Sequence, residues 1–314
     1  MKSLVLKKII TAVVMLFVLS ILICAMIHFL PGDPVTIMLG EFADSEQADA
    51  LRAQLNLDKP FIFQYGLWIK GVLRGDWGNS ILDKSPVKET VFERFPRTLM
   101  LCVVPIIIAL LIAIVFGIIS AARRNSFADL GISIVSLFLM SIPEFWTGIM
   151  LMLIFAVLIP VLPAGGYIKQ GDTFQQFIRY MILPLSTIVI SSTPGTLRMV
   201  RSSMLDVLDE DYIMLAKTKG NSNFRCNYVH GLRNAMIPIA TSVSMQLTGM
   251  IGGAVVIEKV FQFPGLGLLL LNAINYRDYP VVQGSLLLFS ICVVVINLIT
   301  DLMYSLIDPR IRTK

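Results

Sequence analysis

The sequence predicts an all-α membrane protein, a polytopic bundle of about six transmembrane helices. Of its 314 residues, 56% are hydrophobic and only 15% are charged, whereas an ordinary soluble domain carries roughly 25% charged residues. The apolar residues also fall into long blocks rather than into an amphipathic pattern. Because a helix needs about 20 apolar residues to cross the hydrocarbon core of a bilayer, these blocks are long enough to span it. Most of the chain is therefore expected to lie in a membrane.

Six apolar blocks have this length, and each is expected to form one span. They cover residues 9–30, 99–122, 131–160, 177–197, 235–257 and 283–307. Pro184 and Pro194 interrupt the fourth block, and Gly249, Gly252 and Gly253 crowd the fifth. Proline and glycine are tolerated in membrane helices whose neighbours satisfy the freed backbone. The three glycines would also let another helix approach closely.

The distribution of Lys and Arg predicts the orientation of these spans. Fourteen of them lie in the N-terminus, the 121–129 loop, the 198–234 segment and the C-terminus, and only four lie in the two short loops on the opposite side. Short loops rich in Lys and Arg stay in the cytoplasm, so both termini are expected to be cytoplasmic. This excess also accounts for the net charge of +5, which therefore gives no indication of a nucleic-acid partner.

The spans divide the chain into two expected regions. Residues 1–97 hold the first span, which is expected to be retained rather than cleaved as a signal peptide, because no small-residue cleavage site follows it. The same region holds an external amphipathic segment, in which Pro60 separates two short helices over residues 45–73. Residues 98–314 hold the other five spans and the cytoplasmic loop 198–234.

The cytoplasmic loop carries the start and stop signals of a short, rigid helix. Ser203, followed three residues later by Asp206, resembles a capping box. Acidic residues from Asp209 to Asp211 favour a second helix start, because negative charge stabilises the N-terminal end of the helix dipole. Gly220 stands where a helix ends in the left-handed conformation.

One side of this short helix offers an apolar stripe. Leu208, Tyr212, Leu215 and Ala216 recur at helical spacing. A stripe of this kind can bind a partner protein. A loop helix that packs on its own bundle would show the same pattern, so both interpretations remain open at this point.

No catalytic residues, cofactor site or metal site are predicted. The four cysteines are far apart and are expected to be inert packing residues, and the two histidines are isolated. An intramembrane enzyme would need paired acids, a Ser–His pair or an HExxH run. A self-contained secondary transporter or a channel would usually show an internal repeat or a filter sequence. The chain also lacks the G-x-x-x-x-G-K-[ST] pattern that binds nucleotide phosphates.

Glu144 and Trp146 are candidates for lining a solute pathway. Ionisable residues inside membrane spans are rare because burial of charge in lipid is costly, so each is a functional candidate. Glu144 lies partway along the third predicted span, directly after Pro143. A capping or helix-pairing role beside the proline is the alternative.

Several stretches of the chain together resemble one known family. The segments Glu210-Asp-Tyr-Ile-Met-Leu-Ala-Lys-Thr-Lys-Gly220 and His230-Gly-Leu-Arg-Asn-Ala-Met-Ile-Pro238 resemble the coupling loop of bacterial ABC importer permeases of the dipeptide, oligopeptide and nickel family. Five further stretches resemble the same family in the expected order: Leu30-Pro-Gly-Asp-Pro34, Gly71-Val-Leu-Arg-Gly-Asp-Trp-Gly78, Val256-Ile-Glu-Lys-Val-Phe-Gln-Phe-Pro-Gly-Leu-Gly267, Arg277-Asp-Tyr-Pro280 and Asp308-Pro-Arg-Ile-Arg312. The resemblance covers nearly the whole chain.

The resemblance implies a type I ABC importer permease fold with a cytoplasmic coupling helix, in the bacterial plasma (inner) membrane. It implies two cytoplasmic ABC ATPase subunits that bind ATP and Mg, a second homologous permease subunit and an extracytoplasmic substrate-binding protein, with membrane lipid around the bundle. Small peptides, including glutathione, are the expected cargo, and nickel or a metal chelate is the alternative. Hydrolysis of ATP would then lie on other polypeptides.

The resemblance also assigns the contacts to the ATPase. The helix over residues 209–219 would insert into a groove on the ATPase. Ala216, Gly220 and Leu232 match the general importer loop, whereas Met214, Leu215, His230 and Arg233 do not. The residues expected to couple the chain to the ATPase are Asp211, Tyr212, Leu215, Ala216, Gly220 and Arg233.

Overall fold

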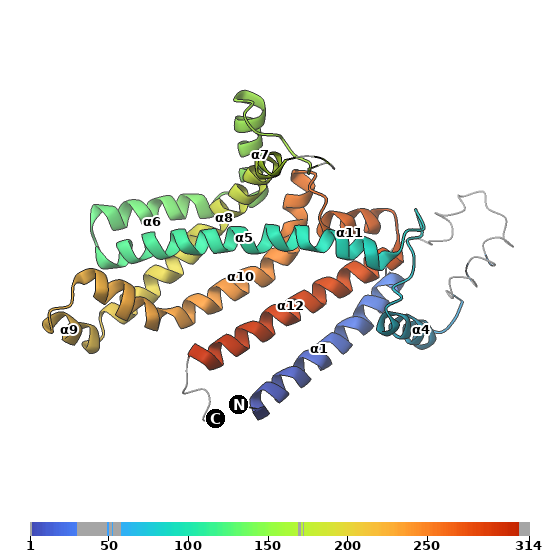
Figure 1. The fold of residues 1–314 in the computed structure, drawn as a ribbon, viewed down its shortest axis with the longest axis horizontal. Coiled ribbons are helices and arrows are strands. Elements are labelled where there is room, and N and C mark those ends of the chain that lie inside the picture. Colours follow the sequence, from blue (N-terminus) through green and yellow to red (C-terminus); the bar gives the residue numbers. More distant parts are fainter. Residues whose placement is uncertain are drawn as a thin grey trace. The chain divides into compact units, whose positions relative to one another are not determined.

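The structure is a computed structural model that describes residues 2–29, 49, 52, 58–168, 171 and 173–307. Within these residues every regular element is helical apart from one isolated bridge (Figure 1). The helices are α1 (Lys2–Phe29), α4 (Phe61–Arg74), α5 (Val87–Ala122), α6 (Phe127–Met140), α7 (Glu144–Met152), α8 (Phe174–Leu208), α9 (Asp211–Thr218), α10 (Leu232–Val260), α11 (Leu266–Asn275) and α12 (Tyr279–Ile307), with π-helical segments η1 (Leu153–Leu158) and η2 (Arg225–Gly231). They form two compact units: unit 1 combines Met1–Thr98 with Pro264–Leu298, and unit 2 combines Leu99–Phe263 with Ile299–Lys314.

Five helices are long and apolar enough to cross a membrane, and each overlaps one of the six predicted spans. They are Leu6–Met26, Val87–Ala122, Phe174–Leu208, Arg225–Val260 and Tyr279–Leu302. The all-α membrane fold is thus confirmed. The polar ends of α5, α8 and α10 make these helices longer than the apolar blocks that predict them.

The third predicted span, over residues 131–160, is not one continuous helix. It is a pair of helices, Phe127–Met140 and Glu144–Leu158, bent by 92°. Proline disfavours the helical conformation in the residue before it and has no N–H to donate. Pro143 therefore ends the first helix and stands as the N-cap residue of α7, with φ −61° and ψ 139°.

Helix α8 continues through the two prolines of the fourth predicted span. Pro184 and Pro194 both lie inside it. The hydroxyl groups of Thr187, Thr193 and Thr196 donate to carbonyl oxygens one turn earlier, at 2.8, 2.6 and 3.1 Å. These polar groups are thereby paired inside the helix, as a non-aqueous environment requires.

The core of unit 2 lies where α5, α8 and α10 meet (Figure 1). Its buried members are Ala113, Ile118, Ala121, Leu197, Val200, Met204, Ala235 and Ile239. A Cβ atom at Gly117 of α5 would lie 2.7 Å from a methyl carbon of Val200 on α8. Glycine at this position therefore allows the two helices to pack closely.

A second close approach fixes the loop after η1 against the end of α10. The amide of Gly166 donates to the carbonyl oxygen of Phe261 at 2.7 Å. A Cβ atom at Gly165 would lie 2.3 Å from that same oxygen.

Replacement of Gly165 by alanine is expected to destabilise unit 2 by about 1–3 kcal/mol, the usual cost of overpacking, because the clashing atom belongs to the backbone and cannot rotate away. The measurement is the thermal unfolding midpoint of the purified protein in detergent. Gly131→Ala is the matched control, since no described atom lies within 4 Å of a Cβ there. Equal midpoints for the two variants would contradict the close approach.

Unit 1 is held by a buried polar cluster between two chain segments far apart in the sequence. The hydroxyl of Ser80 and the amide of Ile81 both donate to the carboxylate of Asp278, the second at 3.0 Å. The Ser80 and Asp278 residues are 4% and 3% exposed. Nearby, the amide of Leu266 donates to the hydroxyl of Thr98 at 2.8 Å. Two of the stretches that carry the family resemblance, 71–78 and 277–280, thus lie next to the same cluster.

Helix α4 is the second of the two amphipathic helices predicted over residues 45–73; the first lies outside the described residues, apart from two isolated positions. Tyr65 of α4 shares a hydrogen bond of 2.9 Å with the Ser20 hydroxyl of α1 and contacts Phe17 edge to face. Gly75 ends the helix in the left-handed region, at φ 84°. The polar hydroxyl pair anchors α4 to the first span.

Candidate functional site

Helix α9 follows α8 after a two-residue turn, close to where the sequence predicts a short helix. The prediction covers residues 209–219, and the helix spans Asp211–Thr218 with Asp211 in its first turn. Gly220 has φ +84°, the left-handed conformation expected of a glycine after a helix. The amide of Lys219 donates to the carbonyl of Leu215 at 3.1 Å, which completes the last turn.

The capping box predicted at Ser203 and Asp206 is wrong. Both residues lie inside α8, which continues to Leu208. Val200 and Met204 still pack into the core of unit 2 with no exposed surface, so the apolar face extends the helix past these local cap signals. The acidic residues just after α8, rather than Ser203 and Asp206, mark the start of the next helix.

One face of α9 is buried in the chain and another is open. Ile213 is completely buried, whereas Tyr212 and Leu215 are 41% and 56% exposed. Ala216 is half-buried beside them. We call Tyr212, Leu215 and Ala216 the α9 stripe. The sequence leaves two interpretations open: a helix that packs on its own bundle, and a helix that binds a partner. Helix α9 does pack on its own bundle, through Ile213, but it leaves the α9 stripe accessible to a partner.

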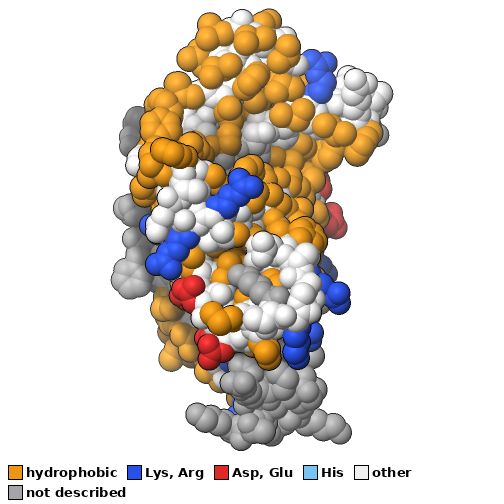
Figure 2. All heavy atoms as spheres, turned by 90° about the vertical axis from the view of Figure 1, so that its left-hand side faces the viewer, with side chains coloured by type: hydrophobic (Ala, Val, Ile, Leu, Met, Phe, Trp, Pro, Cys, Tyr) orange, Lys and Arg blue, Asp and Glu red, His pale blue; other side chains and the backbone are white. Residues whose placement is uncertain are grey.

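Exposed charged residues precede and follow the accessible stripe along the chain. Figure 2 faces the end of unit 2 that carries α9; Lys, Arg, Asp and Glu side chains lie in the lower half of this face, and hydrophobic side chains cover most of the upper half. Burial, with a smaller contribution from the charge of Glu210, raises the pKa of Tyr212, and the interaction with Asn234 opposes that rise. Tyr212 therefore remains a neutral hydroxyl at physiological pH. Arg233 is exposed in the first turn of α10, and Asp211 is exposed at the start of α9.

Two ion pairs join the start of α6 and the turn before it to α8 and its C-cap residue, and no sequence pattern indicates either. The guanidinium of Arg201 makes two hydrogen bonds of 2.8 Å to the carboxylate of Asp129. Asp129 is 4% exposed and also accepts from the hydroxyl of Ser120 and the amide of Asn125. Arg124, in the turn between α5 and α6, pairs with Asp209 at 3.5 Å on the surface. These contacts hold the C-terminal end of α8, which leads into α9, against the start of α6 and the turn before it.

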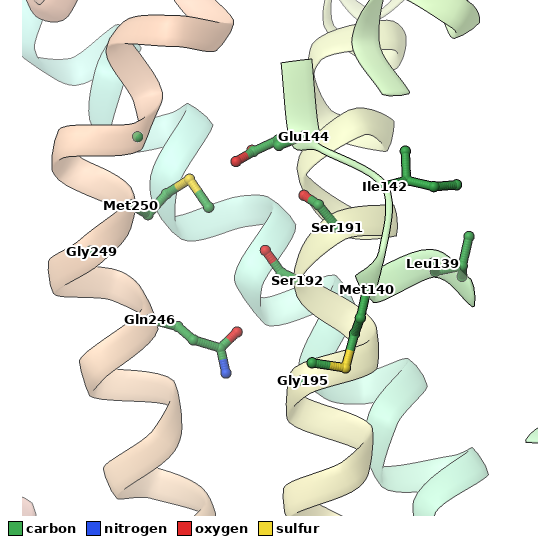
Figure 3. Close-up of a pocket in the computed structure, with 11 residues that line it drawn as sticks. Leu139, Met140, Ile142, Glu144, Ser191, Ser192, Gly195, Gln246, Gly249 and Met250 are labelled. Atoms are coloured by element: carbon green, nitrogen blue, oxygen red, sulfur yellow. The ribbon is translucent and has the colours of Figure 1, made fainter. Parts of the chain in front are cut away.

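A cavity of about 380 Å³ lies in unit 2 between the α6–α7 break, α8 and α10. Figure 3 shows the carboxylate of Glu144 pointing into it, with Ser191 and Ser192 below and Gln246 across from them. Gly195, Gly249 and Gly253 also line it. The side-chain amide of Gln246 donates to the hydroxyl of Thr196 at 3.0 Å, a hydrogen bond that joins α10 to α8 at the cavity.

The structure brings one of the two predicted pathway residues to this cavity. Glu144 lines it, whereas Trp146 is 46% exposed and is not among the lining residues. The expected close helix at Gly249 and Gly252 is wrong for the described residues, because no atom of theirs lies within 4 Å of a Cβ at either position. Gly249 enlarges the cavity instead. Among the residues described, no group of three His, Cys, Asp or Glu could hold a metal ion.

Comparisons with known proteins match the chain over nearly its whole length. Residues 113–313 match the family model "Binding-protein-dependent transport system inner membrane component", and residues 1–102 match the model of the N-terminal part of such components. A glutathione transport system permease protein of Salmonella paratyphi A is 39% identical over 315 residues, which cover 100% of both chains. An oligopeptide transport system permease protein of Bacillus subtilis is 36% identical over 99% of this chain and 100% of its own.

One solved structure has the same fold. A chain of the inward-facing MetNI methionine ABC transporter superposes with a TM-score of 0.59 at 18% identity, covering 71% of this chain and 98% of that chain. The likeness confirms the ABC importer permease fold.

Proposed function

The chain belongs to the family of binding-protein-dependent transport system inner membrane components, and from this premise we propose that it forms half of the pathway of an ATP-driven importer of small peptides. It is a multi-pass membrane protein of the inner membrane. The observation that supports small peptides as the cargo is the match to glutathione and oligopeptide permeases along the full chain.

The accessible α9 stripe supports a mechanical role for this helix. Docking in a groove on a cytoplasmic ATPase would cover Tyr212 and Leu215, which are large apolar side chains left open here. When the ATPases bind ATP and close, they would pull α9. The end of α8, held by its ion pairs, would transmit this movement to the spans as a rigid body. ATP and Mg would bind to the partner subunits.

The assembly needs four kinds of partner. Two ATPase subunits would contact the cytoplasmic side, where both termini would also lie. A second homologous permease would complete the pathway, an extracytoplasmic binding protein would deliver the cargo, and lipid would cover the outer apolar surface. The exposed apolar side chains of α1, such as Val13 and Val14 at 60% and 55% exposure, suit that lipid contact.

The test is uptake by the complete importer in proteoliposomes. The chain is reconstituted with its partner permease and ATPases, and the loaded binding protein is added outside with labelled dipeptide, glutathione or nickel. ATP-driven accumulation of a peptide or of glutathione is expected. Accumulation of nickel alone, or of peptide without ATP, would contradict the proposal.

A further inference from the structure

The cavity beside the α6–α7 break has an unusual distribution of charge. Of the eleven residues that line it, Glu144 is the one with an ionisable side chain. The others are apolar or small, apart from Gln246 and the two serines. A carboxylate among apolar groups is costly unless it is paired, and the rest of the lining supplies no cation for it.

One oxygen of this carboxylate has no partner within the described residues. Glu144 Oε1 is buried and accepts no hydrogen bond there. Ser191 lies within hydrogen-bonding reach of the same carboxylate. Its hydroxyl, however, is also 3.1 Å from the carbonyl oxygens of Thr187 and Ile188, which can take its single proton. Glu144 Oε1 can therefore still accept a hydrogen bond.

The two arginines that follow the cavity-lining residues along α8 are ion-paired or exposed. Arg201, two turns below the cavity on α8, makes both of its short hydrogen bonds to Asp129. Arg198 is exposed at the surface. A metal ion would require further carboxylate or imidazole ligands, and the lining supplies Glu144 alone. A cationic hydrogen-bond donor that enters the cavity would satisfy this oxygen.

We propose that Glu144 forms a transient subsite for the free α-ammonium group of a peptide in transit. An ammonium group supplies both the charge and the N–H donors that Oε1 lacks, and such charge-assisted bonds are among the stronger ones. Gln246 lies across the cavity; its amide nitrogen donates to Thr196 and Ser242, and its side-chain oxygen would accept from the N–H of the peptide bond that follows. A volume of about 380 Å³ lies within the range of small-ligand pockets. The subsite rests on the proposed function, because it names the group that the pathway would recognise.

The test measures labelling of Glu144 in the purified, complete importer without its binding protein. An apolar carbodiimide modifies carboxyl groups in membrane interiors, and mass spectrometry gives the rate at residue 144. Dialanine is expected to slow this labelling roughly tenfold at saturation, which corresponds to about 1.4 kcal/mol. N-acetyl-dialanine, which has no ammonium group, is expected to leave the rate unchanged.

Each other outcome overturns the subsite. Equal protection by both peptides would mean that the cavity binds peptide without using the charge. No protection by either would remove Glu144 from a peptide site. The Glu144→Gln variant checks transport, and its uptake of dialanine is expected to fall roughly tenfold, whereas Glu144→Asp, which keeps the charge, should recover part of it.

Failure of the proposed function gives a different result. A wild-type importer that accumulates no peptide with ATP contradicts the function itself. A wild-type importer that accumulates dialanine, with a Glu144→Gln variant that matches it in rate and KM, contradicts only the subsite.

Discussion

Replacement of Ala216 by glutamate is expected to abolish ATP-driven uptake while the protein still inserts and folds. Ala216 is the small member of the α9 stripe, between the exposed Tyr212 and the buried Ile213. A bulky charge there would be buried without a partner on docking, at a cost of several kcal/mol. Since about 1.4 kcal/mol is a factor of ten, we expect uptake to fall roughly 100-fold and copurification of the ATPase to be lost.

The control places the same charge elsewhere on the helix. Met214 is 68% exposed and lies on the opposite side of α9 from Tyr212, so Met214→Glu should keep most of the uptake. Normal transport by Ala216→Glu would contradict docking through the stripe. An equal loss of uptake in both variants would mean that the ATPase contacts all sides of α9 rather than the stripe alone.

The largest expected loss of stability follows from removal of Arg201. In Arg201→Met the carboxylate of Asp129 stays buried without its cation, which costs about 3–5 kcal/mol for a fully buried pair. The Arg201 side chain is 29% exposed, so we expect about 2–3 kcal/mol. The measurement is the unfolding midpoint in detergent, which should fall by roughly 5–10 °C.

A second substitution distinguishes loss of the pair from loss of packing. Asp129→Leu in the Arg201→Met background removes the orphaned charge and should restore more than half of the midpoint. Arg124→Met serves as the exposed control. The side chains of Arg124 and its partner Asp209 are 58% and 73% exposed, so loss of this pair should lower the free energy of unfolding by less than about 0.5 kcal/mol. An unchanged midpoint in Arg201→Met would show that water replaces the guanidinium.

The sequence predicts what depends on local pattern and composition. Apolar length alone locates five spans, and the acidic start and Gly220 locate α9 to within two residues at its start and one at its end. The break at Pro143 is also a local signal, but the apolar residues on both sides of it favour a single span. The capping signal at Ser203 fails because tertiary packing of α8 outweighs it.

The remaining features depend on contacts between distant segments. Asp129 and Arg201 are 72 residues apart, and in the sequence each is an ordinary charge near the end of an apolar block. The cavity needs three helices to meet, and its glycines predict close packing as readily as open space. Its one acidic residue, Glu144, can be singled out because charge inside an apolar block is rare.

The 92° corner between α6 and α7 constrains where the chain can meet lipid tails. A helix leaves its first amides unpaired, and α7 has no side-chain cap for them, because its N-cap residue is proline. Hydrocarbon offers these N–H groups no acceptor, and each would lose several kcal/mol there. The corner must therefore be wet or covered by protein, and the acyl chains of the bilayer have to stop short of it.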